Sequence, residues 1–264
     1  MRPRPTRSDL PHWIAFALLM ALAAWLLVRA GAAMPYRWQW QRVPQYLFKT
    51  YQGHVYPGPL LNGLGVTLVV SAWAFVVALA AGLLAALLLL SGSRVGRGVA
   101  RGYVELIRNT PLLVQLYLFY FVLAPILGIG RTLTGILTLG LFEGAFAAEV
   151  IRAGILAVPA GQREAAAGLG LTNWQAMRLV VLPQAARVVL PPLASLAISI
   201  VKHSAIISVI AIFDLANEAR GIIADTFMTF ELWLTVAAIY LGVTIILSLL
   251  ASLLERRLAR GTSR

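Results

Sequence analysis

Residues Glu164 to Pro183 have the sequence EAAAGLGLTNWQAMRLVVLP, and this stretch decides how the rest of the chain is interpreted. It begins with a charged pair, Arg163-Glu164, continues through small residues and ends at a proline. Apolar runs flank it on both sides. A segment with so little bulk suits neither a protein core nor a membrane span. We therefore predict a short helix and turn in the cytoplasm, with a small-residue face that another protein can approach closely.

The composition around this stretch is that of an integral membrane protein. Of the 264 residues, 60% are apolar and only 12% are charged, whereas soluble domains carry about 25% charged residues. Several apolar runs approach or exceed the ~20 residues that cross a bilayer. The chain has no cysteine and only three histidines, which lie far apart in sequence. This composition excludes a disulfide, a thiol nucleophile and a cysteine-ligated metal, and it disfavours a histidine metal site.

Hydropathy predicts an all-α fold with about six transmembrane helices. The expected spans cover about residues 13–28, 64–90, 112–127, 133–156, 185–213 and 232–254. An aromatic and polar segment, 34–58, follows the first span, and we expect it to be partly helical and to lie outside the membrane or in the headgroup zone. The first span is either a cleaved signal peptide or a retained anchor, and its length favours retention.

The positions of Lys and Arg give an orientation. With both termini in the cytoplasm, fifteen of these residues lie inside and six outside, and Lys202 lies within a span. This bias satisfies the positive-inside rule. The net charge of +12 is then explained by topology and lipid contact, and it gives no reason to expect nucleic acid binding. The loop 157–183 is placed in the cytoplasm, and the acidic loop 214–231 is placed outside.

The opening stretch resembles the EAA signature of permease subunits of ATP-binding-cassette importers. The match comprises Glu164-Ala165-Ala166, then Gly170, then Val180 and Leu182-Pro183, with valine where isoleucine is usual. The segment from Arg108 to Gln115 is similar to the RGTPLLVQ stretch of the polar amino acid branch, with Asn109 in place of glycine. Residues 142–152, Gly161-Gln162 and Val201-Lys202 with Ser204 also fit that branch.

The resemblance covers about residues 60–257 and implies a five-helix permease core with one extra N-terminal helix. We accordingly divide the chain into an N-terminal helix with its aromatic segment (1–58), a permease domain (59–257) with its coupling loop, and a basic cytoplasmic tail (258–264). The implied location is a bacterial inner membrane. The implied partners are ATPase subunits, a second permease chain, identical or related, and a periplasmic solute-binding protein that delivers substrate to loops such as 213–231.

The resemblance also implies where the motor docks: two short helices that meet at a Gly turn are expected to sit in a groove of the ATPase subunit. The residues expected to couple to it are Arg163, Glu164, Ala165, Ala166, Gly170, Leu182 and Pro183. The chain has no GxxxxGK[ST] phosphate loop, so we expect it to bind no cofactor and to leave ATP hydrolysis to the partner subunit. Motifs of a membrane protease or lipase, HExxH and GxSxG, are also absent. We therefore predict no catalytic residue and no metal ligand.

Polar residues within the spans are the candidates for the substrate path. A lone cation at the bilayer centre costs about 2.5–3.5 kcal/mol, so Lys202 is expected either to bind a substrate carboxylate or to pair with Glu143 or Glu149. A snorkelling side chain is the third alternative. His203, where the family more often has an acid or amide, is either a neutral donor and acceptor or helix filler.

Three further residues complete the candidates. Ser204 follows His203 directly, and Glu143 and Gln115 lie on the preceding spans. Glu149 is expected to pair structurally with Arg152 at i,i+3. The whole pattern predicts a permease subunit of an ATP-driven amino acid importer that works by alternating access. The alternative is a secondary transporter or channel without a motor, which would need no docking loop.

Overall fold

The computed structural model describes residues 10–33 and 36–260, and the chain divides into two units, residues 1–39 and 40–264. The first unit contains helix α1, Leu10–Ala33, which forms where the first span is predicted. Its apolar part, His12–Leu26, is shorter than the other candidate spans of the described chain. A membrane crossing by α1 therefore stays a prediction. Residues 40–58 group with the second unit and not with α1.

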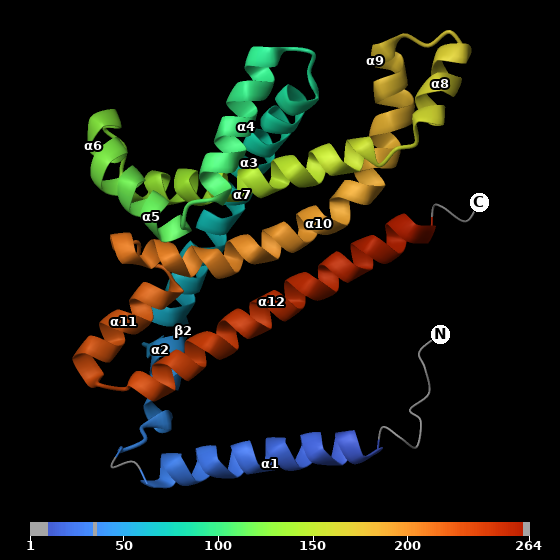
Figure 1. The fold of residues 1–264 in the computed structure, drawn as a ribbon. Coiled ribbons are helices and arrows are strands. Elements are labelled where there is room, and N and C mark those ends of the chain that lie inside the picture. The colour runs from blue at the N-terminus through green and yellow to red at the C-terminus, as the bar shows by residue number, and fades with distance from the viewer. Residues whose placement is uncertain (1–9, 34–35, 261–264) are drawn as a thin grey trace. The chain divides into compact units, whose positions relative to one another are not determined.

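The second unit is almost entirely helical (Figure 1). In chain order its described elements are η1 (Trp40–Arg42), α2 (Pro44–Leu47), β1 (Phe48–Tyr51), β2 (His54–Pro57), α3 (Pro59–Leu90), α4 (Arg94–Arg108), α5 (Leu112–Tyr117), η2 (Leu118–Leu123), α6 (Ala124–Leu127), α7 (Arg131–Leu156), α8 (Ala160–Gly168), α9 (Asn173–Ala176), η3 (Met177–Val181), α10 (Leu182–His203), η4 (Ser204–Ile210), α11 (Leu215–Thr226) and α12 (Thr229–Arg260).

Four helical segments of the described chain are long and apolar enough to cross a membrane. They are Pro59–Leu90, Arg131–Leu156, Asn173–Ile210 and Thr229–Leu253. A fifth crossing is possible only as a bent pair, because α4 and the segment Leu112–Leu127 meet at 107°. The sequence predicted a third span over about residues 112–127, with a separate loop before it. It did not anticipate that α4 and this segment would together form one broken unit.

Small residues let α3 and α7 pack closely. The position that a side chain would occupy at Gly140 lies 2.6 Å from Cβ of Val77, and at Gly82 it lies 2.6 Å from Cβ of Ala147. Without a hydrophobic force between helices in lipid, close backbone approach at small residues supplies the packing contacts. The same surface of α3 and α7 also presses against α10, through the core cluster that contains Leu139, Leu196 and Ile200.

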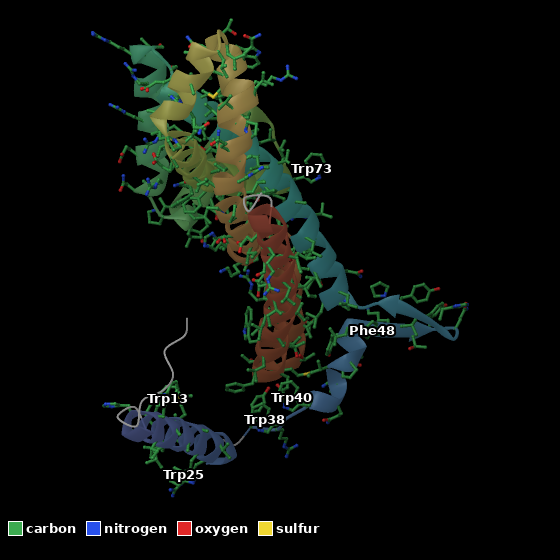
Figure 2. The ribbon with its side chains drawn as sticks, turned by 90° about the vertical axis from the view of Figure 1, so that its right-hand side faces the viewer. Trp13, Trp25, Trp38, Trp40, Phe48 and Trp73 are labelled. Carbon is green, nitrogen blue, oxygen red and sulfur yellow. The ribbon has the colours of Figure 1, made fainter. Side chains whose placement is uncertain are left out.

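The aromatic segment before α3 is partly helical, as expected, because it contains η1 and α2. It also contains an element that was not predicted, an antiparallel hairpin formed by residues Phe48–Tyr51 and His54–Pro57. Figure 2 shows it projecting sideways from the end of α3, with Phe48 at its base. Gln52 and Gly53 both have positive φ, 50° and 77°, the two-residue turn that suits the twist of a hairpin. The many aromatic residues of this segment were read as an interfacial composition, and the pattern of two short strands was overlooked.

The predicted acidic loop 214–231 is also largely helical. Asp214 caps the N-terminus of α11 by accepting a hydrogen bond from the backbone N–H of Asn217 at 3.0 Å. Asp214 and Glu231 are fully buried. Two of the four acids of this segment therefore support the packing of α11 and α12 and are not available to an outside partner.

Candidate functional site

A cavity of about 310 Å³ lies between α7 and α10. Its lining residues are Phe142, Glu143, Phe146, Ser195, Leu196, Ser199 and His203. The α10 members 195, 199 and 203 recur at four-residue spacing, which puts them on one face of that helix. Two phenylalanine rings of α7, Phe142 and Phe146, lie 5.3 Å apart and form an aromatic wall. The cavity thus combines an apolar wall with hydroxyl groups and one ionisable pair.

That ionisable pair joins the two helices across the cavity. Nδ1 of His203 lies 2.6 Å from Oε1 of Glu143. The Glu143 side chain is almost fully buried, with 4% exposed, whereas that of His203 is 43% exposed and faces the open part of the cavity. A carboxylate buried this deeply needs a hydrogen-bonding partner, and His203 supplies it. The imidazole also lies edge-on to the Phe142 ring, with 6.1 Å between ring centroids.

The structure rejects the alternative in which Lys202 pairs with an acid of α7. Glu143 pairs with His203, and Glu149 pairs with Arg152 at 2.9 Å, which confirms the predicted i,i+3 pair. Lys202 itself is exposed and does not line the cavity. It lies in the last turn of α10, just before the chain tightens into the 3₁₀ helix η4.

Two other residues that were predicted to line the substrate path instead form hydrogen bonds to the backbone. Ser204 is buried, and its hydroxyl donates to the carbonyl of Val201 at 2.8 Å. Gln115 is also buried, and its amide donates to the carbonyl of Ile107 at 2.8 Å and to the hydroxyl of Thr110 at 2.7 Å. Gln115 therefore fastens the break between α4 and α5. Neither residue lines the cavity.

Arg108, which the sequence-based list of site residues omits, stands beside the cavity. Its guanidinium lies over the ring of Phe146, 5.5 Å from the centroid. The bend that Gln115 fastens comes directly after Arg108, so the turn and the stacked ring together fix this cation at the cavity wall. The signal was present in the sequence, because Arg108 begins the stretch that resembles RGTPLLVQ. Phe142 and Phe146 lie in the stretch 142–152, which also fits that branch, whereas the two serines gave no comparable signal.

The loop between α7 and α10 has the predicted form of two short helices that meet at a glycine. Gly170 has φ +77°, and it ends α8 in a Schellman arrangement: Leu171 N–H donates to the Ala166 carbonyl and Gly170 N–H to that of Ala167. Thr172 then begins α9 through a reciprocal capping box with Gln175. Both ends are therefore fixed by local hydrogen bonds.

The surface of this loop is more apolar than its small residues suggested. Leu169 is 82% exposed and Trp174 is 69% exposed. Among the predicted docking residues, Glu164, Ala165, Gly170, Leu182 and Pro183 are exposed, whereas Ala166 is buried. Arg163 donates to the carbonyl of Ile155 near the end of α7 at 3.3 Å, so it ties the loop to the span. The sequence reasoning missed Trp174 as a docking candidate.

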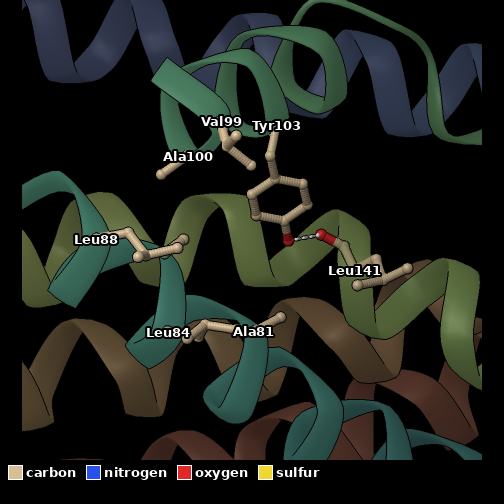
Figure 3. Close-up of a pocket in the computed structure, with 8 residues that line it drawn as sticks. Ala81, Leu84, Leu88, Val99, Ala100, Tyr103 and Leu141 are labelled. Atoms are coloured by element: carbon tan, nitrogen blue, oxygen red, sulfur yellow. Dashed lines mark hydrogen bonds between the residues drawn. The ribbon is translucent and has the colours of Figure 1, made fainter. Parts of the chain in front are cut away.

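A second cavity, of about 210 Å³, lies between α3, α4 and α7 and is drawn in Figure 3. Its walls are aliphatic apart from Tyr103, whose hydroxyl donates to the carbonyl of Leu141 at 2.6 Å. With this hydroxyl already engaged, the pocket offers no free polar group to orient a polar solute. The cavity between α7 and α10 is therefore the better candidate for a solute site.

Comparison with known proteins agrees with these features. Residues 78–260 match the family described as binding-protein-dependent transport system inner membrane component. The glutamine transport system permease protein GlnP of Escherichia coli K12 is 36% identical over 202 residues, which cover 75% of this chain and 92% of GlnP.

Two further relatives extend the comparison. The glutamate/aspartate import permease protein GltJ of the same organism is 34% identical over 216 residues, covering 76% of this chain and 88% of GltJ. A crystal structure described as an amino acid ABC transporter with histidines is 42% identical, with a TM-score of 0.71, covering 75% of this chain and 94% of that one.

Proposed function

The chain belongs to the family of binding-protein-dependent transport system inner membrane components, and from this membership we propose that it is the permease subunit of an ATP-driven importer of amino acids. The relatives named for glutamine and for glutamate and aspartate support an amino acid as the cargo. The rival of a motor-free secondary transporter is not favoured, because the permeases it resembles work in such importers and the chain presents an ordered docking loop.

The observation that carries the proposal is the cavity between α7 and α10. An amino acid zwitterion has an ammonium group and a carboxylate; the cavity is lined by the Glu143 carboxylate, and the Arg108 guanidinium, outside the lining, stacks on the Phe146 ring of its wall. Glu143 can accept from the ammonium group, and Arg108 at the wall can donate to the carboxylate. The Phe142 and Phe146 rings exclude water on one side, which strengthens both interactions.

His203 is given a positioning role at this site. Its bond to Glu143 keeps the carboxylate oriented in the cavity, and its half-exposed ring leaves the second nitrogen available to the solute. Lys202, exposed on a helix that crosses the membrane, cannot face lipid without the cost of a cation in hydrocarbon. We assign it to the surface along the substrate path that a second permease chain completes. This arrangement makes Lys202 part of the path without making it part of the cavity.

The loop 157–183 couples ATP hydrolysis by the partner subunit to movement of this chain. With no phosphate loop of its own, the chain depends on an ATPase subunit, which binds ATP and docks on the exposed Leu169, Gly170 and Trp174. The loop connects directly to α7 on one side and to α10 on the other, the two helices that form the cavity. A movement of the loop therefore changes the spacing of the cavity walls, which is the requirement of alternating access.

The orientation follows from the same arrangement. The docking loop must face the cytoplasm, where ATP is hydrolysed, and the count of Lys and Arg by side agrees. The end of α12 is then cytoplasmic, and α11 with the hairpin lies on the side of the solute-binding protein; the predicted crossing by α1 would bring the N-terminus to the cytoplasm as well. Figure 1 supports this assignment, because α8 and α9 lie at the opposite end of the second unit from α11.

The decisive experiment is uptake by the complex reconstituted in proteoliposomes with its ATPase and solute-binding protein. We expect Glu143→Gln to lower ATP-dependent amino acid uptake at least tenfold while the complex still assembles in size-exclusion chromatography. Glu149→Gln, on the same helix but outside the cavity, is the matched control and should keep more than half of the uptake. Uptake that survives Glu143→Gln, or that continues without ATP, would overturn the proposal.

A further inference from the structure

The hairpin Phe48–Pro57 carries strand residues that are exposed on both faces. All eight residues of β1 and β2 are exposed. An isolated two-stranded hairpin is only marginally stable in water. Two features preorganise this one: the positive-φ turn at Gln52 and Gly53, and the four-pair register that ends at Tyr51 opposite His54. Within the described part of the chain, all eight strand residues stay exposed although β1 lies beside α2 and α11, so an ordered hairpin here implies a further surface that covers it.

The two faces of the hairpin differ in chemistry. Because side chains alternate along a strand and paired residues share a face, the register separates two sets of four. We call Phe48, Thr50, Val55 and Pro57 the apolar face, and Lys49, Tyr51, His54 and Tyr56 the polar aromatic face. On the apolar face, Phe48 is 54% exposed and Val55 is 67% exposed. This pattern is that of an amphipathic element and not of a water-exposed loop.

The hairpin is held at the edge of the membrane. Only Gly58 separates it from α3, and a side chain at Gly58 would come within 2.4 Å of the Tyr46 carbonyl oxygen. Gly58 N–H also donates to the carbonyl of Leu47 at 2.7 Å. The link between hairpin and span is therefore tight. Leu60 of α3 and Leu232 of α12 share one core cluster, so two spans begin at this same level.

The length of α3 indicates at which level of the bilayer the hairpin lies. With 32 residues and a rise of 1.5 Å each, the helix is about 48 Å long. A bilayer is about 40–45 Å thick with its headgroups, around ~30 Å of hydrocarbon. With α3 centred in the bilayer, its first residue lies about 24 Å from the midplane, which is the outer edge of the headgroup zone, and the hairpin joins α3 at that level. Figure 2 shows the hairpin directed away from the axis of α3.

We propose that the hairpin is a lipid anchor, with the apolar face on the acyl chains and Lys49 at the level of the phosphates. Tyrosine rings favour this zone because they join an apolar ring to a polar hydroxyl, and Tyr51 and Tyr56 occupy the opposite face. A cavity of about 630 Å³ beside β1 is lined by Arg42, Gln45 and Lys49 among others. These cationic and amide groups suit the phosphate of a phospholipid headgroup.

The anchor has a consequence for the transporter. Burial raises the pKa of the Glu218 carboxyl on α11, and the positive charge of the nearby Lys49 opposes this rise. The hairpin therefore lies beside α11, whose Ile222 also lines the cavity next to β1. Lipid bound there fixes the outer ends of α3 and α11 relative to the bilayer surface.

The test uses the absence of cysteine in the chain. Single cysteines are introduced as Val55→Cys on the apolar face and His54→Cys on the polar aromatic face, and each carries a nitroxide. The full chain is reconstituted in bilayers of phosphatidylcholine with phosphatidylglycerol, and accessibility to oxygen and to a water-soluble nickel chelate is measured by power saturation. Val69→Cys on α3, 58% exposed, marks the hydrocarbon, and Asp225→Cys on α11 marks water.

We expect the ratio of oxygen to nickel accessibility to be at least threefold higher at position 55 than at position 54. Adding Lys49→Gln should lower the ratio at position 55 by about half in phosphatidylglycerol bilayers. Equal nickel accessibility at positions 54 and 55, close to that at 225, would overturn the anchor. So would labels that become protected only when the solute-binding protein is added, because the hairpin would then be a protein-docking site. An unchanged ratio with Lys49→Gln would remove the phosphate contact from the proposal.

Discussion

Replacing Trp174 with alanine tests whether the loop 157–183 docks through an apolar contact. The ring stands on α9 with 69% of its surface exposed, beside the sharp turn at Gly170. Exposed tryptophan is uncommon on a surface that only meets water, and tryptophan is enriched among residues that dominate protein interfaces. We therefore expect the variant to weaken binding of the ATPase subunit without disturbing the permease fold.

The magnitude follows from the exposed area. A buried aromatic side chain covers about 150–250 Å², so the 69% that is exposed amounts to about 100–170 Å². At about 25 cal/mol per Å² this area is worth about 3–4 kcal/mol. Ordering the side chain costs about 1 kcal/mol, which leaves about 2–3 kcal/mol. The dissociation constant should therefore rise about 30- to 140-fold.

The assay is binding of the purified ATPase subunit to the permease immobilised in nanodiscs, measured by surface plasmon resonance. Trp73→Ala is the matched control, because Trp73 on α3 is 59% exposed but belongs to a membrane span. We expect no change in affinity for that variant. A dissociation constant for Trp174→Ala within twofold of the unaltered protein would refute the reasoning, as would an equal loss with Trp73→Ala.

Three further predictions concern stability. Gly140→Val should lower the melting temperature in detergent, because its side chain meets Val77 at 2.6 Å and overpacking costs about 1–3 kcal/mol; Gly102→Ala, with open space around it, should not lower it. Gly170→Ala should cost about 1–2 kcal/mol from the positive φ and should raise the protease sensitivity of the loop. Burial raises the pKa of Asp214 from 3.8 to about 6, against the opposing effects of backbone N–H groups and Arg220. Folding therefore takes up a proton between these values, so unfolding free energy should fall by up to about 3 kcal/mol as pH rises from 4 to 6 and then level off. In thermal unfolding, Asp214→Asn should flatten that pH dependence, and a slope retained by the variant would contradict the assignment to Asp214.

Local patterns in the sequence were sufficient for several features. The docking loop was predicted as two short helices around Gly170, and the structure has that form because the caps at Gly170 and Thr172 use only neighbouring residues. The Glu149–Arg152 pair was predicted for the same reason, since residues three apart on a helix lie on adjacent turns. Four of the six expected spans appear as helices long and apolar enough to cross.

Other predictions were wrong or incomplete where the local sequence pattern was ambiguous. Residues 48–57 hold the tyrosines and lysine of an interface, and composition alone did not show that they alternate about a two-residue turn. The break at 109–111 was expected to start a span. The structure shows a bend of 107° between α4 and the segment Leu112–Leu127, and the Gln115 amide bonds back across it to the last turn of α4. The acids of 214–231 suggested a solvated loop, although burial of Asp214 and Glu231 makes them part of the helix packing.

By itself, the sequence determined the membrane class, the docking loop and the family, because hydropathy, turn residues and motif spacing are local properties of the chain. The tertiary structure alone decided which polar residues share a cavity. His203 and Glu143 are 60 residues apart in sequence, and only the packing of α7 against α10 brings them to 2.6 Å. Lys202, one residue from His203, turns about 100° away around the helix and stays outside. Whether Lys202 or His203 lines the cavity depends on how α10 is rotated about its axis. Contacts with helices distant in the sequence set that rotation.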